Sequence, residues 1–344
     1  MVSIKDIATR ARVSLGTVDR VLHNRGRVSE ETRVRVQKII SDLGYRPNIY
    51  ARNLSLGKEF RFGVLMPKLS QDNNYWSVPA KGIDRAGREL QPHKVRVQYF
   101  HFDRYSERSF EGSFRRALKE KLDGMLIAPV LTHAAERLIP TVPHDVPYVF
   151  FDSTVPTAKC LSFIGQDPYQ SGLLAAHLME NLIRQEGSVA IIKVVPDDFH
   201  INERIRGFQS GLNGISRVRA RLYEADSHGG ESAFRRASAE ILRDNKDLQG
   251  IFVTNAWTHP FARHLKSEPG RENILIIGYD LVGKNLKYLE SGSIDLLISQ
   301  RPAMQGYEGM YCLYEHVVLR ENVEEKIMVP IDILTKDNLK YYQD

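Results

Sequence analysis

The chain has 344 residues, 42% of them hydrophobic, and a formal net charge of +6 at neutral pH, a composition typical of a soluble globular protein. This length is too great for one ordinary core and predicts two or three domains. No run of about 18 apolar residues is present, so we expect no membrane span. The start, MVSIKDIA, lacks the apolar stretch of a secretory signal, so we expect a cytoplasmic protein.

Two further features of composition bear on function. Cys160 and Cys312 lie far apart and neither belongs to a CxxC motif, so we expect reduced thiols in apolar surroundings, and neither a metal nor a cofactor. The first 60 residues hold twelve Lys/Arg and six Asp/Glu, and therefore carry the whole net charge, while the other 284 are neutral on balance. This concentration of positive charge is typical of a segment that binds a polyanion.

Three short helices are predicted between residues 4 and 44. Apolar residues recur at helical spacing from Ile4 to Ala11, and Ser14 is a good N-cap for a second helix. Ser29 caps a third helix, which Gly44 ends. The predicted small core consists of Ile4, Ile7, Ala8, Ala11, Val18, Val21, Leu22, Val36, Ile39, Ile40 and Leu43.

Two short helices joined by about four residues indicate a helix-turn-helix, whose second helix enters the major groove of DNA. A basic three-helix bundle with no nucleic-acid role is the alternative. After Pro47, the segment from Asn48 to Leu56 is predicted to be helical and to end at Gly57. It is too short to be stable alone in water, so we expect it to fold only against a partner chain or DNA. Leu54 is either a wedge for a minor-groove step or an ordinary core or linker leucine.

These patterns together resemble one family. Residues 3–58, with IKDIA, VS-LG-TV-DRVL, RVSEETR, LGYRPN and ARNL, resemble the LacI/GalR family of bacterial transcription regulators. The resemblance implies a homodimer, repressor activity at a pseudo-palindromic operator, and paired hinge helices in the minor groove. It assigns base-reading positions to Leu15, Gly16 and Arg20, positions near phosphates to Ser14, Thr17 and Asn24, and hinge contacts to Asn48, Arg52 and the intercalating Leu54.

Two residues depart from the family pattern in the second helix. Gly16 has no side chain, so one usual base contact is missing. Asp19 stands where the family usually has Ser, and its carboxylate either pairs with an arginine or accepts from a cytosine amino group. We therefore expect sequence recognition to depend on Arg20, Leu15 and the hinge, with Arg20 suited to a bidentate contact with guanine worth about 1–3 kcal/mol.

From residue 61 onward, short apolar runs alternate with helical stretches, which predicts parallel α/β sheets. The strands are too many for one sheet, so we expect two α/β subdomains. No GxGxxG, GxxxxGK[ST], GxSxG or HExxH motif occurs, which disfavours an enzyme. The predicted strands are Phe62–Met66, Val95–Phe100, Gly124–Ala128, Tyr148–Phe151, Val189–Val195, Arg219–Tyr223, Gly250–Val253, Ile274–Ile277, Ile294–Ser299 and Ile327–Ile333.

This region, with FGVLMP, LDGMLIAPV, FIGQDPYQSGLLAAHLM and ILIIGYD among its landmarks, resembles the family's effector domain, which is similar to periplasmic sugar-binding proteins. The resemblance implies three crossings between subdomains, near Phe163, Ile294 and Val329. The expected domains are an all-α head at 1–46, a hinge helix and linker at 47–60, and an effector domain at 61–344. Its first subdomain is expected at about 61–162 and 295–328, and its second at about 163–294 and 329–344.

A ligand is expected in the cleft at the carboxyl ends of the strands. Arg204 in NERIRGF matches the family's effector-contacting arginine. Asp280 is equally a helix N-cap, and Trp76 equally a packing residue. Ala256 stands where sugar-binding members commonly have Asp, which leaves a less hydroxylated ligand, a modified sugar or a sugar acid open. The candidate effector contacts are Tyr75, Trp76, Asp152, Asn202, Arg204, Asn255, Asp280 and Gln300.

The resulting hypothesis is a transcriptional regulator in which a small carbohydrate-like effector closes the cleft and changes whether the hinge segments fold on DNA. Whether the effector releases the protein from DNA or recruits it cannot be read from the sequence. Two other classes of protein fit less well. A solute-binding protein of transport would account for the second part of the chain but not for the basic head. A sugar-modifying enzyme is disfavoured because the chain has no catalytic motif.

Overall fold

A computed structural model of the chain describes residues 4–22, 26, 28–43, 58–194, 198–214, 218–226 and 230–342. The chain forms two units, Met1–Gly57 and Lys58–Asp344, which are considered separately. The predicted helix end at Gly44 and the predicted hinge helix lie outside the described residues, and so do Asn24, Asn48, Arg52 and Leu54.

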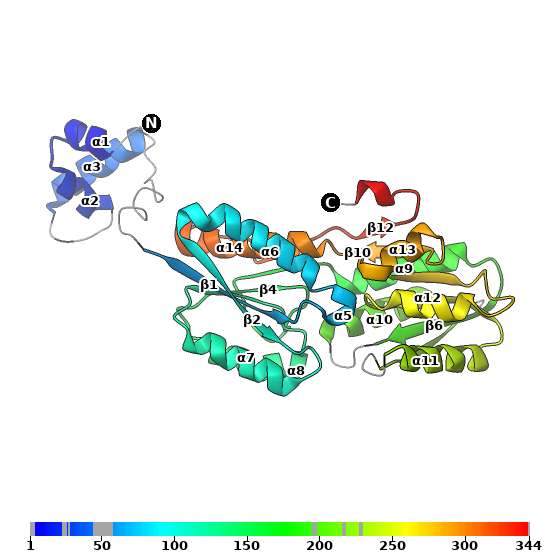
Figure 1. Ribbon diagram of the computed structural model, residues 1–344. Helices are drawn as coiled ribbons and strands as arrows, with labels where there is room; N and C mark the ends of the chain where they lie inside the picture. Colours follow the sequence, from blue (N-terminus) through cyan, green and yellow to red (C-terminus); the bar gives the residue numbers. More distant parts are fainter. Residues whose placement is uncertain are drawn as a thin grey trace. The chain divides into compact units, whose positions relative to one another are not determined.

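The first unit contains the three predicted helices, α1 (Ile4–Ala11), α2 (Leu15–Leu22) and α3 (Glu30–Asp42) (Figure 1). The predicted N-caps are confirmed, because Ser14 Oγ accepts from the backbone N–H of Thr17 at 3.1 Å and Ser29 Oγ accepts from that of Thr32 at 3.4 Å. The apolar stripes meet in one small cluster whose fully enclosed members are Ile7, Ala8, Ala11, Val18, Val21 and Val36.

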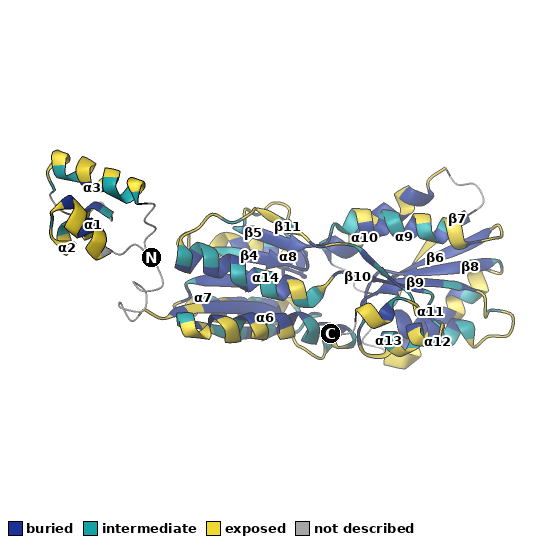
Figure 2. Ribbon diagram, turned by 90° about the horizontal axis from the view of Figure 1, so that it is seen from above, coloured by how far each residue is buried: buried dark blue, intermediate teal, exposed yellow. Residues whose placement is uncertain are grey.

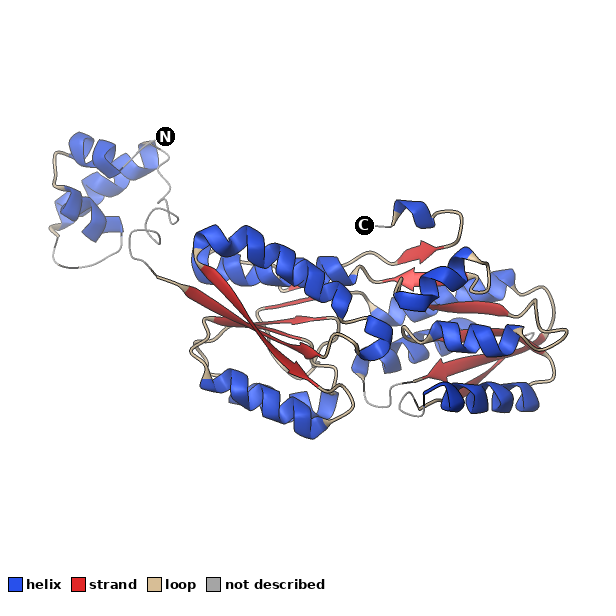
Figure 3. Cartoon of the chain, viewed as in Figure 1, coloured by secondary structure: helices blue, strands red, loops and turns tan. Residues whose placement is uncertain are grey.

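The second unit has two α/β subdomains, each built on a six-stranded sheet (Figure 3). In the first sheet the order is β11-β5-β4-β3-β1-β2, and all neighbouring strands are parallel. A parallel sheet is covered on both faces, so its inner strands β1, β3, β4 and β5 are mostly apolar and buried, while the edge strands β2 and β11 are partly exposed. The strands are β1 (Phe60–Pro67), β2 (Val95–Phe102), β3 (Gly124–Ile127), β4 (Tyr148–Phe151), β5 (Ser162–Gly165) and β11 (Lys326–Met328).

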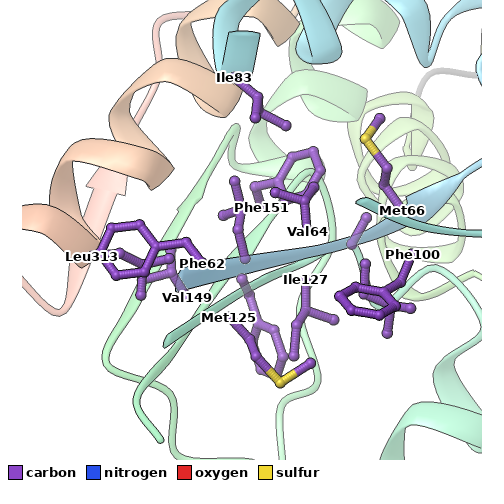
Figure 4. Packing of buried hydrophobic residues seen from close by; sticks show 14 of the residues in the cluster. Phe62, Val64, Met66, Ile83, Phe100, Met125, Ile127, Val149, Phe151 and Leu313 are labelled. Carbon is purple, nitrogen blue, oxygen red and sulfur yellow. The ribbon is translucent and has the colours of Figure 1, made fainter. Parts of the chain in front are cut away.

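Helices cover both faces of this sheet, with α6 and α14 on one side and α7 and α8 on the other (Figure 1). Side chains of β1, β3 and β4 pack with Ile83 of α6 and Leu313 of α14 in one continuous core (Figure 4). The helices are α5 (Gln71–Asn74), α6 (Ser77–Leu90), α7 (Glu107–Lys119), α8 (Thr132–Leu138) and α14 (Pro302–Tyr314). Short 3₁₀ turns follow α6 and α8 at Gln91–His93 and Ile139–Thr141, and a π-helical turn follows α14 at Glu315–Leu319.

The second sheet has the order β12-β10-β9-β8-β6-β7 and is parallel except for the antiparallel pair β10–β12. Two separate clusters of apolar side chains line its two faces, one under α9 and α10 and the other under α11, α12 and α13. Its inner strands are buried, while the edge strand β7 and the outer helix surfaces are largely exposed (Figure 2). The strands are β6 (Gly187–Lys193), β7 (Val218–Glu224), β8 (Leu248–Val253), β9 (Leu275–Tyr279), β10 (Leu296–Ser299) and β12 (Asp332–Leu334). The helices are α9 (Pro168–Leu182), α10 (Phe199–Leu212), α11 (Gly230–Asp244), α12 (Thr258–Lys266) and α13 (Gly283–Glu290), and a 3₁₀ turn at Leu339–Tyr341 follows β12.

Strand pairing corrects the subdomain boundaries expected from the sequence. The expected crossings near Phe163 and Ile294 are wrong, because β5 pairs within the first sheet and β10 within the second. The chain therefore crosses after Gly165 and again after Ser299, in each case only once the strand is complete. The predicted strand Ile327–Ile333 is in fact two strands, β11 and β12, in different sheets. The short strand β5 was not predicted from the sequence.

The three connecting segments lie side by side. The buried side chain of Gln166, on the first connection, donates from Nε2 to the carbonyl of Ser299 on the second and to that of Pro330 on the third, both at 3.0 Å. Arg301, on the second connection, forms a bidentate ion pair with Asp332 at 2.6 and 3.0 Å. The crossings are therefore tied to one another by side chains.

Candidate functional site

The exposed face of α2 is the candidate DNA-reading surface. Leu15 is 53% exposed, although it is a large apolar residue, and Gly16, Asp19 and Arg20 are also exposed. Ser14 is exposed before the helix, and Thr17 is half-buried with its hydroxyl 3.0 Å from that of Ser14. The inward stripe of the same helix holds Val18 and Val21, so packing fixes which face of α2 is free.

The candidate effector site is a cavity between the two subdomains, at the carboxyl ends of their strands. The structure brings seven of the eight predicted contacts to its wall. The first subdomain contributes Tyr75, Trp76 and Asp152. The second contributes Arg204, Asn255, Asp280 and Gln300. The free space between them is about 20 Å³, close to what a single water molecule needs, so a sugar requires the walls to move apart.

Arg204 is held rigidly at the centre of the second subdomain's wall. It is 1% exposed, and its two terminal nitrogens donate to the carbonyl of Thr254 and to Gln300 Oε1, both at 2.9 Å. Its guanidinium lies 3.8 Å from the ring centroid of Tyr279, a cation–π contact. The remaining donor, Nε, is buried without a hydrogen-bond partner, and is therefore available to a ligand oxygen.

Helix packing sets the depth of Arg204. The Cβ of an alanine at Gly172 in α9 would lie 2.0 Å from the carbonyl oxygen of Arg204, and one at Gly207 in α10 would lie 2.0 Å from that of Tyr169. Only glycine permits this close approach of the two backbones. The pair of glycines thus lets α10 lie flat against α9 and brings Arg204 to the strand ends.

On the first subdomain's wall, Asp152 follows β4 in a left-handed backbone conformation, with φ of 68°. Tyr75 donates its hydroxyl to Asp152, and burial raises the pKa of both groups. Trp76 is fully buried, donates from Nε1 to Asp72 Oδ2 at 2.8 Å and packs edge-on to Phe151, so it serves both as core and as cavity wall.

Asp280 occupies the corresponding strand end in the second subdomain, after β9, again with φ of 68°. It does not cap a helix, since α13 begins only after Val282. Gln300 Nε2 donates to both carboxylate oxygens at 3.3 Å, while burial, opposed by the charge of Arg204 and aided by that of Asp152, raises the pKa of Asp280 to about 7.

Two expectations on the second subdomain's wall need comment. The prediction that Asn202 lines the cavity is wrong, because Asn202 is exposed. It lies two residues before Arg204 on α10, which corresponds to about 200° of rotation around the helix. Asn255 does line the cavity, and its Nδ2 is buried without a partner. The next residue, Ala256, puts a methyl group where an acid was expected, and its carbonyl accepts from Asn285 at 2.9 Å.

Sequence reasoning missed three polar residues of the wall, Asp72, Arg104 and His200. Asp72 and Arg104 lie in the loops that follow β1 and β2, so the same rule of strand ends applies to them. The rule failed for Arg104 because the predicted strand ended at Phe100 and the observed one at Phe102. His200 belongs to no recognisable motif in the sequence, yet its Nδ1 lies 2.6 Å from Asp198 Oδ1.

The cavity has no surplus of positive charge. Arg104 is within 2.8 Å of Asp72 and also pairs with Asp198, so its charge is fully compensated. Arg204 faces a wall that also holds Asp152 and Asp280. Among the described residues, no group of three His, Cys, Asp or Glu side chains has metal-binding geometry, and no helix is long and apolar enough to cross a membrane.

Comparisons with known proteins agree with both units. Residues 3–48 match the model of bacterial regulatory proteins of the lacI family, and residues 62–321 match a periplasmic binding protein domain. A ribose operon repressor from Lactococcus lactis is 24% identical over 99% of this chain and 98% of its own length.

Two solved structures align with the second unit. A structure described as a LacI transcriptional regulator from Bacteroides fragilis has a TM-score of 0.74 and 25% identity, covering 83% of this chain and all of that one. A sugar-binding protein of a sugar ABC transporter from Bacillus halodurans has a TM-score of 0.68 and 25% identity, covering 82% of this chain and all of that one. With its helix-turn-helix head and its two-subdomain periplasmic-binding-protein body, the chain belongs to the LacI family of bacterial regulatory proteins.

Proposed function

We propose that this regulator is a cytoplasmic repressor whose operator affinity is set by a small neutral sugar bound between the two subdomains of its body. The observation that carries the proposal is the position of Arg204, which lines the cavity, is buried and held by three neighbours, and has no hydrogen-bond partner at Nε. The names of similar proteins, a ribose operon repressor and a sugar-binding protein, point to the same ligand class.

The polar groups of the wall suit hydroxyl groups. Arg204 Nε and Asn255 Nδ2 are buried donors without partners, whereas Asp152 and Asp280 offer carboxylate oxygens. A hydroxyl both donates and accepts, so a ring with several hydroxyls satisfies both kinds of group at once. The aromatic side chain of Trp76 offers an apolar surface to the C–H face of such a ring.

Charge selects among sugars. Because Arg104 and His200 already pair with Asp72 and Asp198, Arg204 is left to face both Asp152 and Asp280. A carboxylate or phosphate on the ligand would add negative charge to a buried site with no cation to spare. We therefore favour a neutral sugar over the uronates and sugar phosphates that the sequence left open.

On DNA, we propose that α2 lies in the major groove, with Arg20 and Leu15 contacting bases and Ser14 and Thr17 near phosphates. Gly16 allows close approach of the helix but reads no base. Asn24, Asn48, Arg52 and Leu54 remain proposed contacts from the family resemblance.

A homodimer would place two such helices on a two-fold symmetric operator. The outer strands β2 and β7, with half-buried Val97 and exposed Leu222, are unpaired edges suited to a second copy.

We propose that the protein acts as a ligand-controlled switch of operator affinity and not as an enzyme. A ligand that binds one arrangement of the subdomains more tightly shifts the population toward it, and the same coupling changes operator affinity. We propose that the sugar lowers operator affinity, as expected of an inducible repressor.

Thermal unfolding with a panel of ligands tests the ligand class. D-ribose, D-arabinose and D-allose are the neutral members, and D-glucuronate and ribose 5-phosphate the anionic ones. A neutral sugar at 100 times its Kd should stabilise the protein by about 2.7 kcal/mol. Arg204→Met should abolish the shift, while Asn202→Ala, on the same helix but outside the cavity, should keep it.

The same sugar should release the full chain from an operator selected out of random DNA, and that operator should contain two related half-sites. Stabilisation by the anionic ligands alone would contradict the neutral-sugar proposal. A selected site with a single half-site would contradict the dimer.

A further inference from the structure

Three buried charged side chains form a continuous chain across the cleft. Asp72 and Arg104 belong to the first subdomain, and Asp198, the N-cap of α10, belongs to the second. Arg104 Nε lies 2.8 Å from Asp72 Oδ2, and its terminal nitrogens donate to Asp198 Oδ2 and, at 3.1 Å, to the carbonyl of Val130. We call Asp72, Arg104 and Asp198 the cross-cleft ion triad.

Because the triad is buried, its three charged groups are stable only when all of them are paired. Arg104 is 3% exposed and Asp198 is completely enclosed. Burial disfavours the ionised form of Asp198, yet the charges of His200 and Arg104 outweigh it and lower the pKa of Asp198 to about 2. Removing one member of a buried ion pair is strongly destabilising, because the other charge then has neither a partner nor water.

The triad also connects the two walls of the cavity. Asp72 accepts from Trp76 Nε1 at 2.8 Å and from the hydroxyl of Tyr105 at 2.7 Å. On the other side, Asp198 lies 2.6 Å from His200 Nδ1. Separating the subdomains would therefore break the contact of Arg104 with Asp198, and would leave Asp72 with Trp76 on one wall and Asp198 with His200 on the other.

Neutral hydrogen bonds also cross the cleft beside the triad. The backbone N–H of Phe199 donates to Thr132 Oγ1 at 3.1 Å, and Asn73 Nδ2 donates to the carbonyl of Ala256 at 3.2 Å. All of these contacts join protein to protein. They stabilise the closed arrangement by an amount that does not depend on what the cavity holds.

We propose that the cross-cleft ion triad is a built-in closing device, which holds the cleft closed by the protein's own charges. An effector then changes the balance between the closed and the open arrangement only by the difference in its affinity for the two. The identity of the effector rests on the function proposed above, but closure by the triad does not. Arg104 is thus a positioning residue that acts through Asp72 and Asp198. In such a design, weakening the triad changes the switch even when every effector contact is intact.

Distance measurements between spin labels on the two subdomains test this without any effector. Labels at Lys119→Cys and Ala239→Cys, both exposed, in a Cys160→Ser background of the full chain report separation of the subdomains; Cys312 is buried. The triad is altered by Arg104→Met, which removes the charge at similar length, and independently by Asp198→Asn, which keeps the shape. Arg137→Met is the matched control, because Arg137 also pairs with two carboxylates, Glu107 and Glu111, but within one subdomain.

The unaltered triad should give one predominant short distance. Both triad variants should shift the distribution to longer distances, Arg104→Lys should restore part of the short population, and Arg137→Met should leave it unchanged. Unchanged distances in Asp198→Asn, folded as judged by circular dichroism, would overturn the proposal, as would an equal shift in the control. Since no sugar enters this measurement, failure of the ligand panel and failure of the closing device are distinguishable.

Discussion

At the scale of single residues, the body places two acids in conformations that cost energy. Asp152 and Asp280 both end a strand with φ of 68°, in the left-handed region that asparagine, aspartate and glycine tolerate best. Each such residue costs on the order of 1–3 kcal/mol, and the conformation persists only where the surroundings fix it. Here the result is that both carboxylates reach the same cavity from opposite subdomains, which is consistent with a binding role.

Asp280 predicts how stability changes with pH. Its pKa in the folded protein is raised to about 7, against about 3.9 in an unfolded chain, so the folded state holds its proton more tightly. The contribution of this group to stability is therefore fully present below about pH 4 and is lost as pH rises toward 7. We expect Asp280→Asn, which cannot ionise, to raise the unfolding temperature relative to the natural chain more at pH 8 than at pH 5.

Comparing the variant with the natural chain at each pH removes contributions from other groups. His259 is the main one, since burial lowers its pKa to about 4 and its contribution changes in the opposite direction over the same range. A difference in unfolding temperature that is the same at both pH values would show that Asp280 is ionised throughout. The variant should also bind the stabilising sugar more weakly, because the amide replaces one acceptor oxygen by a donor.

At the scale of elements, sequence periodicity located most strands but not the points where the chain changes subdomain. Residues 327–333 were predicted as one strand, yet β11 and β12 pair in different sheets. The contacts of Gln166 with the other two connections are set by tertiary structure, since they join segments more than 130 residues apart in sequence. Local patterns carry no information on such partners.

The contact between α9 and α10 gives a prediction for one glycine. Gly207→Ala would put a methyl group 2.0 Å from the carbonyl oxygen of Tyr169, so α10 must move away from α9 and take Arg204 with it. Overpacking of this kind costs about 1–3 kcal/mol, and we expect that loss in urea unfolding together with at least a tenfold loss of sugar affinity, an order-of-magnitude figure.

Gly112→Ala is the matched control for this change. Gly112 lies inside α7 with nothing within 4 Å of an added Cβ, so alanine there should stabilise the protein by about 1 kcal/mol through helix propensity and leave sugar binding unchanged. Equal behaviour of the two variants would mean that the approach of α9 and α10 does not set the position of Arg204.

At the scale of the whole molecule, charge and ligand chemistry are divided between two units. The first 60 residues carry the entire net charge of +6, and the remaining residues are neutral on balance. Affinity that depends on phosphate neutralisation therefore belongs to the head. The body contributes by binding a small molecule and by changing its own closure.

This division predicts separate effects for two arginines. Arg20→Ala, on the exposed face of α2, should reduce discrimination between the selected operator and random DNA by about 1–3 kcal/mol. Arg235→Ala, exposed on α11 of the body, should change neither operator affinity nor its dependence on salt. Titrations at several salt concentrations measure both quantities, and a comparable loss with Arg235→Ala would assign DNA contact to the body.

By itself, the sequence determined the helix-turn-helix head, the α/β body, the family and seven of the residues that line the cavity, because helix stripes, N-caps, apolar runs and strand-end positions are local properties. Only the tertiary structure decided which of those residues face the cavity and what joins its walls. Asn202 turns away because α10 packs on α9 by one face, and Arg104 meets Asp198 because two loops 94 residues apart are brought together. Such contacts depend on the closing of sheets and clefts, and no local pattern encodes them.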